Sequence, residues 1–112
     1  MNNQATAQAV FDEEAYFELY FPAYKVLSIP AAMLISWVTS QCRFREATSI
    51  IVNREQLQLH LGLSKRNVDD GFRELSQHGL LWIQRRSNGL ELHPSQTWQE
   101  QIIHMIEKES QQ

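Results

Sequence analysis

The chain has little of what marks secreted or membrane-spanning proteins. It has one cysteine, Cys42, so no disulfide can form within it, and a reducing compartment is the expected setting. No apolar run approaches the roughly 18 residues of a membrane helix, which predicts no membrane partner. Acidic residues at Asp12, Glu13 and Glu14, without an early basic run, argue against a secretory signal. We therefore expect a cytoplasmic protein.

Signatures of catalysis and of metal binding are also missing. The four histidines (His60, His78, His93 and His104) show no ligand spacing with one another or with Cys42. Cys42 has no recognisable triad partners, and no glycine-rich phosphate loop is present. The sequence therefore predicts no metal, no cofactor and no enzymatic activity.

Charge is spread unevenly over the 112 residues, whose formal net charge is −3. Residues 1–42 hold one base and four acids, and residues 91–112 also hold one base and four acids. Residues 43–90 hold eight bases and five acids, which makes this segment net basic. A local basic patch matters more for contact with phosphate than the total charge.

The N-terminal third divides into a polar end and an aromatic segment. Residues 1–10 are expected to be flexible. In residues 11–27, Tyr16, Tyr20 and Tyr24 recur every four residues, which favours a helix broken near Pro22, and an extended arm is the alternative. So many aromatic side chains must be covered by the core or by a partner.

Residues 28–52 read as a helix followed by a short strand. Ser28 is placed to cap a helix that tolerates Pro30 in its first turn and ends near Cys42. Its core side is predicted from apolar residues at helical spacing: Met33, Leu34, Trp37 and Val38. The β-branched run at residues 49–52 predicts a strand.

Two short helices joined by a glycine turn are predicted next. Asn53 is a good N-cap with Gln56 at its third position, Gly62 permits the turn, and Ser64 caps the second helix. Gly79 is expected just past the end of that helix. Core residues are predicted at Leu57, Leu61, Val68, Phe72 and Leu75, with Gly71 allowing a close backbone approach.

A β-hairpin and a last helix complete the pattern. Leu81 and Ile83 alternate with Trp82 and Gln84 as in a strand, and Asn88-Gly89 predicts the hairpin turn. Thr97 to Glu100 resembles a capping box for a helix over residues 95–109, followed by a flexible tail at 110–112.

This order of elements resembles the winged helix-turn-helix family over residues 28–94. The resemblance implies a mostly α, α+β fold with a two- or three-stranded wing sheet and extra N- and C-terminal helices. The chain is similar to small bacterial and phage transcriptional regulators and to the winged-helix domains of plasmid and phage replication initiators. The expected function is binding of double-stranded DNA, in transcription regulation or as a replication accessory.

The resemblance also implies which residues meet DNA. Helix 64–78 would read the major groove and wing 84–90 would contact phosphates. The candidate DNA-binding residues are Arg54, Ser64, Lys65, Arg66, Asn67, Arg73, Arg85, Arg86 and Asn88.

Two acids depart from the family pattern. Asp69 and Asp70 stand where neutral or basic side chains are usual, and Gln58 replaces a small residue. An aspartate near phosphate is repelled unless it accepts a hydrogen bond from cytosine or pairs with a base. Spacing of four predicts the pairs Asp69–Arg73 and Arg66–Asp70. The alternative function is a winged-helix module that binds another protein through helix 64–78.

The apolar residues near both ends predict a homodimer, with completion of the core as the alternative. Trp98, Ile102, Met105 and Ile106 form a stripe on the last helix. Both end segments are net acidic, which suits a face turned away from DNA. The candidate interface residues are Tyr16, Phe17, Tyr20, Trp98, Ile102, Met105 and Ile106.

Overall fold

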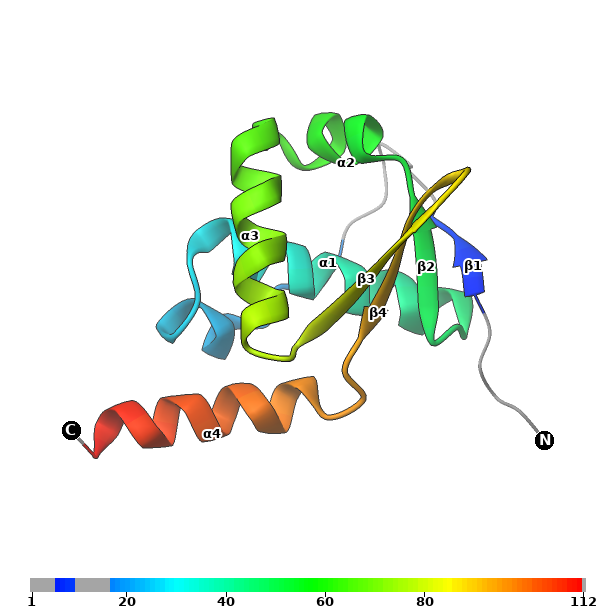
Figure 1. Cartoon of the computed structure of the whole chain (residues 1–112). Helices are drawn as coiled ribbons and strands as arrows, with labels where there is room; N and C mark the ends of the chain where they lie inside the picture. Colours follow the sequence, from blue (N-terminus) through cyan, green and yellow to red (C-terminus); the bar gives the residue numbers. More distant parts are fainter. Residues whose placement is uncertain (1–5, 10–16, 112) are drawn as a thin grey trace.

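A computed structural model describes residues 6–9 and 17–111 of the chain (Figure 1). These residues form an α+β fold with four α-helices and a four-stranded mixed sheet. In chain order the elements are β1 (Thr6–Gln8), the 3-10 helix η1 (Phe21–Lys25), α1 (Ile29–Arg45), β2 (Ser49–Val52), α2 (Arg54–Leu61), α3 (Lys65–Gln77), β3 (Leu81–Arg86), β4 (Gly89–Pro94) and α4 (Trp98–Ser110).

The sheet has one strand more than the two or three predicted. Its strand order is β1-β2-β4-β3, with β1 parallel to β2 and the other neighbours antiparallel. The additional strand is β1, which pairs Thr6 with Ser49 and Gln8 with Ile51. The expectation of a flexible segment over residues 1–10 is therefore wrong for Thr6–Gln8, because the free edge of β2 supplies hydrogen-bond partners that sequence cannot reveal.

Helix α1 lies behind the sheet in Figure 1 and contacts α3, β2 and β4, so it runs through the centre of the fold. Ser28 caps it as predicted, its hydroxyl accepting from the Ala31 amide at 3.3 Å. Leu34 and Trp37 are buried as predicted, whereas Met33 is only half-buried. The helix continues three residues beyond Cys42 to Arg45, and Glu46 then turns the chain in the left-handed region with φ of 50°.

The α2-turn-α3 unit follows the sequence prediction closely. The Asn53 side chain accepts from the Gln56 amide at 3.1 Å, and the Ser64 hydroxyl accepts from the Asn67 amide at 3.0 Å. Gly62 adopts φ of 67°, which is easy only for glycine. Local capping thus fixes both helix starts. The buried face of α2 and α3 carries Leu57, Val68, Phe72 and Leu75.

Gly71 brings α3 against α1. A Cβ atom at this position would lie 2.6 Å from Leu34 Cδ1 and 3.4 Å from the Ala31 nitrogen. Only a residue without a side chain permits this approach, which confirms the prediction for Gly71. The contact fixes the orientation of α3, whose opposite face is exposed.

The hairpin between β3 and β4 turns one residue earlier than predicted. Arg86 pairs with Gly89, so the two turn residues are Ser87 and Asn88. Gly89 begins β4 with φ of 139°, and a Cβ atom there would lie 2.4 Å from the Val52 carbonyl oxygen. The glycine is therefore required for close packing of the hairpin on β2 and not for the turn itself.

The segment around Tyr20 and η1 packs against α4. No helix forms over residues 17–20; the only helix of the described part of 11–27 is the short η1, and residues 10–16 lie outside the description. The Tyr20 amide donates to Ser36 Oγ at 3.0 Å, and its ring meets Trp98 edge-on with centroids 5.0 Å apart. The predicted longer helix is therefore wrong in this part, because tertiary contacts hold the chain in another conformation.

Helix α4 runs beside η1 along the lower side of the molecule in Figure 1. It begins at Trp98, directly after the predicted N-cap residue Thr97, and ends at Ser110, one residue beyond the predicted end at residue 109. Thr97 is the N-cap residue, but its side chain makes no capping bond and contacts Gln101 Oε1 at 3.2 Å instead. The predicted capping box is therefore wrong.

Candidate nucleic-acid interface

The first turn of α3 presents three candidate residues to solvent. Lys65, Arg66 and Asn67 are all exposed, while the Ser64 hydroxyl is occupied by its capping bond. Asn67 is four residues before the buried Gly71, so it lies on the side of α3 nearer α1. Arg66 lies on the exposed stripe that continues along the helix with Asp70 and Arg73. Lys65 is four residues before Asp69 and therefore lies on the side of α3 nearer the hairpin.

The two aspartates of α3 pair with three of the candidate arginines. Asp69 forms an ion pair with Arg54 at the start of α2, so the predicted Asp69–Arg73 pair is wrong. Asp70 contacts both Arg66 and Arg73, and the predicted Arg66–Asp70 pair is confirmed. The prediction for Asp69 failed because α2 packs across α3 and brings Arg54 closer than any residue of the same helix.

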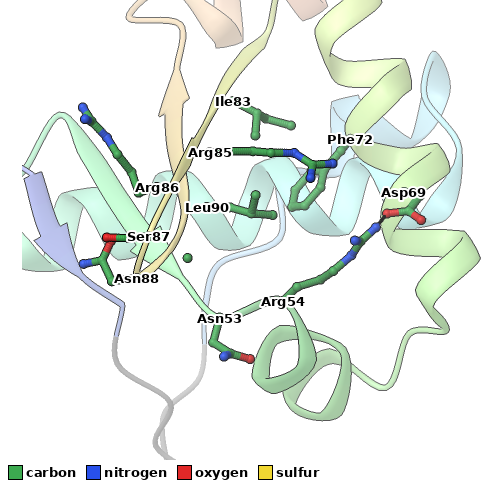
Figure 2. A pocket seen from close by; sticks show the side chains of 11 residues that line it. Asn53, Arg54, Asp69, Phe72, Ile83, Arg85, Arg86, Ser87, Asn88 and Leu90 are labelled. Atoms are coloured by element: carbon green, nitrogen blue, oxygen red, sulfur yellow. Dashed lines mark ion pairs between the residues drawn. The ribbon is translucent and has the colours of Figure 1, made fainter.

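A groove separates α3 from the hairpin (Figure 2). Its volume is about 600 Å³. Phe72, Ile83 and Leu90 supply apolar side chains, and Arg54 and Arg85 supply cationic ones. The remaining lining residues are Asn53, Asp69, Arg86, Ser87, Asn88 and Gly89. The groove therefore combines an apolar lining with arginine side chains from α2 and from the hairpin.

Arg85 and Arg86 of the β3–β4 hairpin point in opposite directions. Figure 2 shows Arg85 extending across the groove toward Phe72 on α3, while Arg86 projects away from it. Successive residues of a strand face opposite sides of a sheet, so the pair cannot act as one cluster. Of the two arginines that were predicted to contact phosphates from this hairpin, only Arg85 extends across the groove. The alternation of side chains that predicts the strand at residues 81–84 also predicts opposite directions for Arg85 and Arg86 when it is continued to residue 86.

Arg86 belongs to a partly buried ion-pair network that sequence analysis did not find. Its Nη2 lies 3.2 Å from Glu91 Oε2, and His93 Nε2 lies 2.6 Å from the same oxygen. The Glu91 side chain is only 7% exposed. The available signal was the i, i+2 spacing of Glu91 and His93 around the buried Leu92, which places both on one face of β4.

Hydrogen bonds from His93 and then from Arg86 lower the pKa of Glu91 below its ordinary value of 4.5. A carboxyl group with a lowered pKa in the folded state favours folding when it is ionised. The stabilisation of the fold by ionised Glu91 is therefore fully present above pH 4.5. It is lost as the pH falls through the lowered pKa that Glu91 has in the folded state. Arg86 is thus held to the sheet at neutral pH.

The other candidate cations differ in whether they have ion-pair or hydrogen-bond partners. Among the described residues, neither Lys65 nor Arg85 has a carboxylate partner within ion-pair distance. The Nε of Arg54 is buried and has no hydrogen-bond partner in the described part of the chain. Asn88 is exposed at the hairpin turn. Lys65 and Arg85 are therefore the cations most available to an external anion.

Cys42 is buried and forms no disulfide. Burial raises the pKa of the Cys42 thiol to about 11, so the thiol stays protonated at neutral pH. Within residues 6–9 and 17–111, no three His, Cys, Asp or Glu side chains gather as a metal site requires. None of the described helices is both long and apolar enough to cross a membrane.

The proposed dimer residues pack largely within the single chain. Ile102 is fully buried in the core, so it is not available to a second copy. Phe17, Tyr20, Trp98, Met105 and Ile106 are partly buried against the same core, and Tyr16 lies outside the described residues. The homodimer stays a prediction.

The large apolar side chains that remain most exposed were not among the candidates. Leu59 on α2 is 85% exposed, Phe21 and Phe44 are each 74% exposed, and Trp82 on β3 is 66% exposed. They lie on four different elements, so sequence periodicity could not group them into one interface.

Comparisons of the chain with protein-family models, with curated proteins and with solved structures found no match.

Proposed function

We propose that the chain is a winged helix-turn-helix protein that binds double-stranded DNA, with α3 in the major groove and the β3–β4 hairpin as the wing. The support from the fold is the order α1-β2-α2-α3-β3-β4, with β2 paired to β4. Residues 62–64 form a three-residue turn that begins with glycine, as is common between the two helices of this motif.

The observation that carries the proposal is the groove between α3 and the hairpin. In B-DNA a single sugar–phosphate backbone separates each major groove from the neighbouring minor groove. If α3 lies in a major groove, that backbone must pass between α3 and a wing placed beside it. The groove contains Phe72, Ile83 and Leu90 for the deoxyribose, and the guanidinium groups of Arg54 and Arg85 for phosphate.

The ion pairs set the expected strength of binding. Asp69 and Asp70 compensate part of the charge of Arg54, Arg66 and Arg73, and Arg86 is held by Glu91. Lys65 and Arg85 are left as the most available cations. One copy therefore neutralises two to four phosphates, and we expect modest affinity that depends clearly on salt.

The test is fluorescence polarisation of the full chain with a random-sequence duplex over a range of salt concentrations. Each phosphate contact contributes about −0.9 to the slope of log Kobs against log salt, so we expect a slope of about −2 to −4. Absence of duplex binding even at 20 mM salt, or binding that does not change with salt, would contradict the proposal.

The rival proposal is a winged-helix module that binds another protein through α3. It is favoured by the alternation of charge on the exposed face of α3, where Arg66, Asp70 and Arg73 follow one another. Such a mixed face suits a protein surface of mixed charge. Absence of duplex binding in the polarisation experiment would favour this rival.

As a DNA-binding protein, the chain would serve in transcription regulation or as a replication accessory. A regulator of bacterial, plasmid or phage type binds its DNA in the cytoplasm, so we propose a cytoplasmic location.

A further inference from the structure

Asp70 holds two arginines on the exposed face of α3. Arg66 Nε lies 3.7 Å from Asp70 Oδ2, and Arg73 Nη1 lies 3.2 Å from Asp70 Oδ1. The three residues are at positions i, i+4 and i+7, so they form one stripe along the helix. Each arginine faces a different oxygen: Arg73 donates a hydrogen bond to Oδ1, and Arg66 lies at ion-pair distance from Oδ2.

Both guanidinium groups retain donors for another ligand. An arginine carries five N–H donors, and Arg66 approaches Asp70 through Nε, which leaves both of its Nη groups outside that contact. Arg73 uses Nη1, which leaves Nη2 and Nε. The side chains of Arg66 and Arg73 are 90% and 67% exposed, so these donors are accessible to a ligand along α3.

The ion pairs of Asp70 differ from the ion pair of Asp69 in their location and in their physical effect. Asp69 and Arg54 are each about one-third exposed and join α3 to α2. The Asp70 pairs lie within one helix and at the surface, and such pairs contribute little to stability. Their effect is to restrict the side-chain conformations of the two arginines, which lowers the entropy lost when these side chains bind a ligand.

We propose that Asp70 is a positioning residue that orients Arg66 and Arg73 toward two guanines of the DNA site. This inference rests on the proposed function of α3. A guanine presents two acceptors, O6 and N7, in the major groove, and an arginine can donate to both. Adenine presents a donor at N6, which a guanidinium cannot satisfy. The restrained arginines therefore favour guanine.

The spacing of the two arginines predicts the spacing of the guanines. Seven residues of α-helix rise roughly 10.5 Å. A helix that follows the major groove is inclined to the duplex axis, and in zinc fingers about two turns of such a helix contact three successive bases. The two arginines are therefore placed to contact bases about two base pairs apart. The preferred site is therefore a short sequence with two guanines at about that separation.

The experiment selects from a duplex library with a randomised 12-base-pair segment, using the full chain and then its variants. For the unmodified chain we expect enrichment of two guanines about two base pairs apart, each preferred by about fivefold or more. Arg66→Ala should remove the preference at one position and Arg73→Ala at the other. Replacement of each guanine by 7-deazaguanine, which lacks the N7 acceptor, should weaken binding of the unmodified chain.

The decisive variant is Asp70→Ala, with Asp70→Glu as the matched control. We expect Asp70→Ala to reduce the guanine preference at both positions together by about fivefold, while affinity for the unselected library rises because an acid has been removed. Asp70→Glu should restore much of the preference. If Asp70 served only the folding of the domain, Asp70→Ala would change thermal stability. The guanine preference and the affinity for the unselected library would then not change in opposite directions.

Several outcomes overturn the inference. Guanine preferences that survive in Asp70→Ala show that the arginines need no positioning. Enrichment of cytosine that is lost in Asp70→Ala shows that Asp70 itself contacts a base. Duplex binding without any guanine preference rejects this inference and leaves the proposed function intact, whereas no retention of any duplex at low salt rejects both.

Discussion

Replacing Lys65, Arg66 and Arg85 together with alanine should lower the affinity for duplex DNA by on the order of a hundredfold. Each residue is an exposed cation beside the groove or on the adjoining face of α3. A charge-assisted contact contributes roughly 1 kcal/mol or more, and three of them sum to about two decades in Kd. The salt slope should also fall by about 2 to 3. Both quantities are measured by polarisation with a random duplex.

The matched control removes the same charge elsewhere. Lys25, Arg45 and Lys108 are exposed on η1, α1 and α4, away from α2, α3 and the hairpin. Their triple alanine variant should lower affinity only slightly, through the change in net charge. Both variants should melt within a few degrees of the unmodified chain, because exposed substitutions seldom change stability by more than about 0.5 kcal/mol. Equal losses of affinity in the two variants would contradict the assignment of this face.

Gly89→Ala should destabilise the fold more than Gly62→Ala does at the turn between α2 and α3. The new Cβ would lie 2.4 Å from the Val52 carbonyl oxygen, and φ of 139° is unfavourable for alanine. Backbone strain and displacement of the hairpin from β2 should together cost about 3 kcal/mol or more. For a chain of this size, that lowers Tm by roughly 10 °C. Thermal unfolding followed by circular dichroism measures the effect.

Gly62→Ala provides the comparison. Gly62 also has a positive φ, of 67°, but nothing lies within 4 Å of an added Cβ. The substitution should therefore cost only about 1 kcal/mol, the penalty for the left-handed conformation itself. If Gly89→Ala were no more destabilising than Gly62→Ala, the hairpin would not pack on β2 as described. Since this contact places the wing beside α3, Gly89→Ala should also weaken duplex binding at temperatures where the variant is folded.

The parts of the fold that sequence predicts well are those fixed by neighbouring residues. The N-caps at Ser28, Asn53 and Ser64 and the turn at Gly62 depend on hydrogen bonds or backbone conformations within a few residues. Their signals are therefore visible in the sequence. Gly71 was also predicted correctly, because a glycine within a helix usually marks a close approach.

The errors concern contacts between distant segments. Strand β1 forms because Thr6–Gln8 meets the edge of β2 more than forty residues away. Periodicity suggested a helix around Tyr20, yet Trp98 and Ser36 hold that residue in a non-helical segment. At the candidate interface, the sequence predicted the Arg66–Asp70 pair but not the partners of Arg54 and Arg86. Asp69 pairs across helices with Arg54, and the direction of Arg86 depends on the buried Glu91.

The most direct test of the central claim is a nuclear magnetic resonance titration of the isotope-labelled full chain with a random duplex at low salt. If the backbone of DNA lies in the groove between α3 and the hairpin, amide shifts should change mainly for residues 53–54, 64–73 and 84–90. Amides of α4 and η1, on the acidic terminal segments, should remain unchanged. Changes concentrated on α4 and η1, or no changes at any duplex concentration, would contradict the claim.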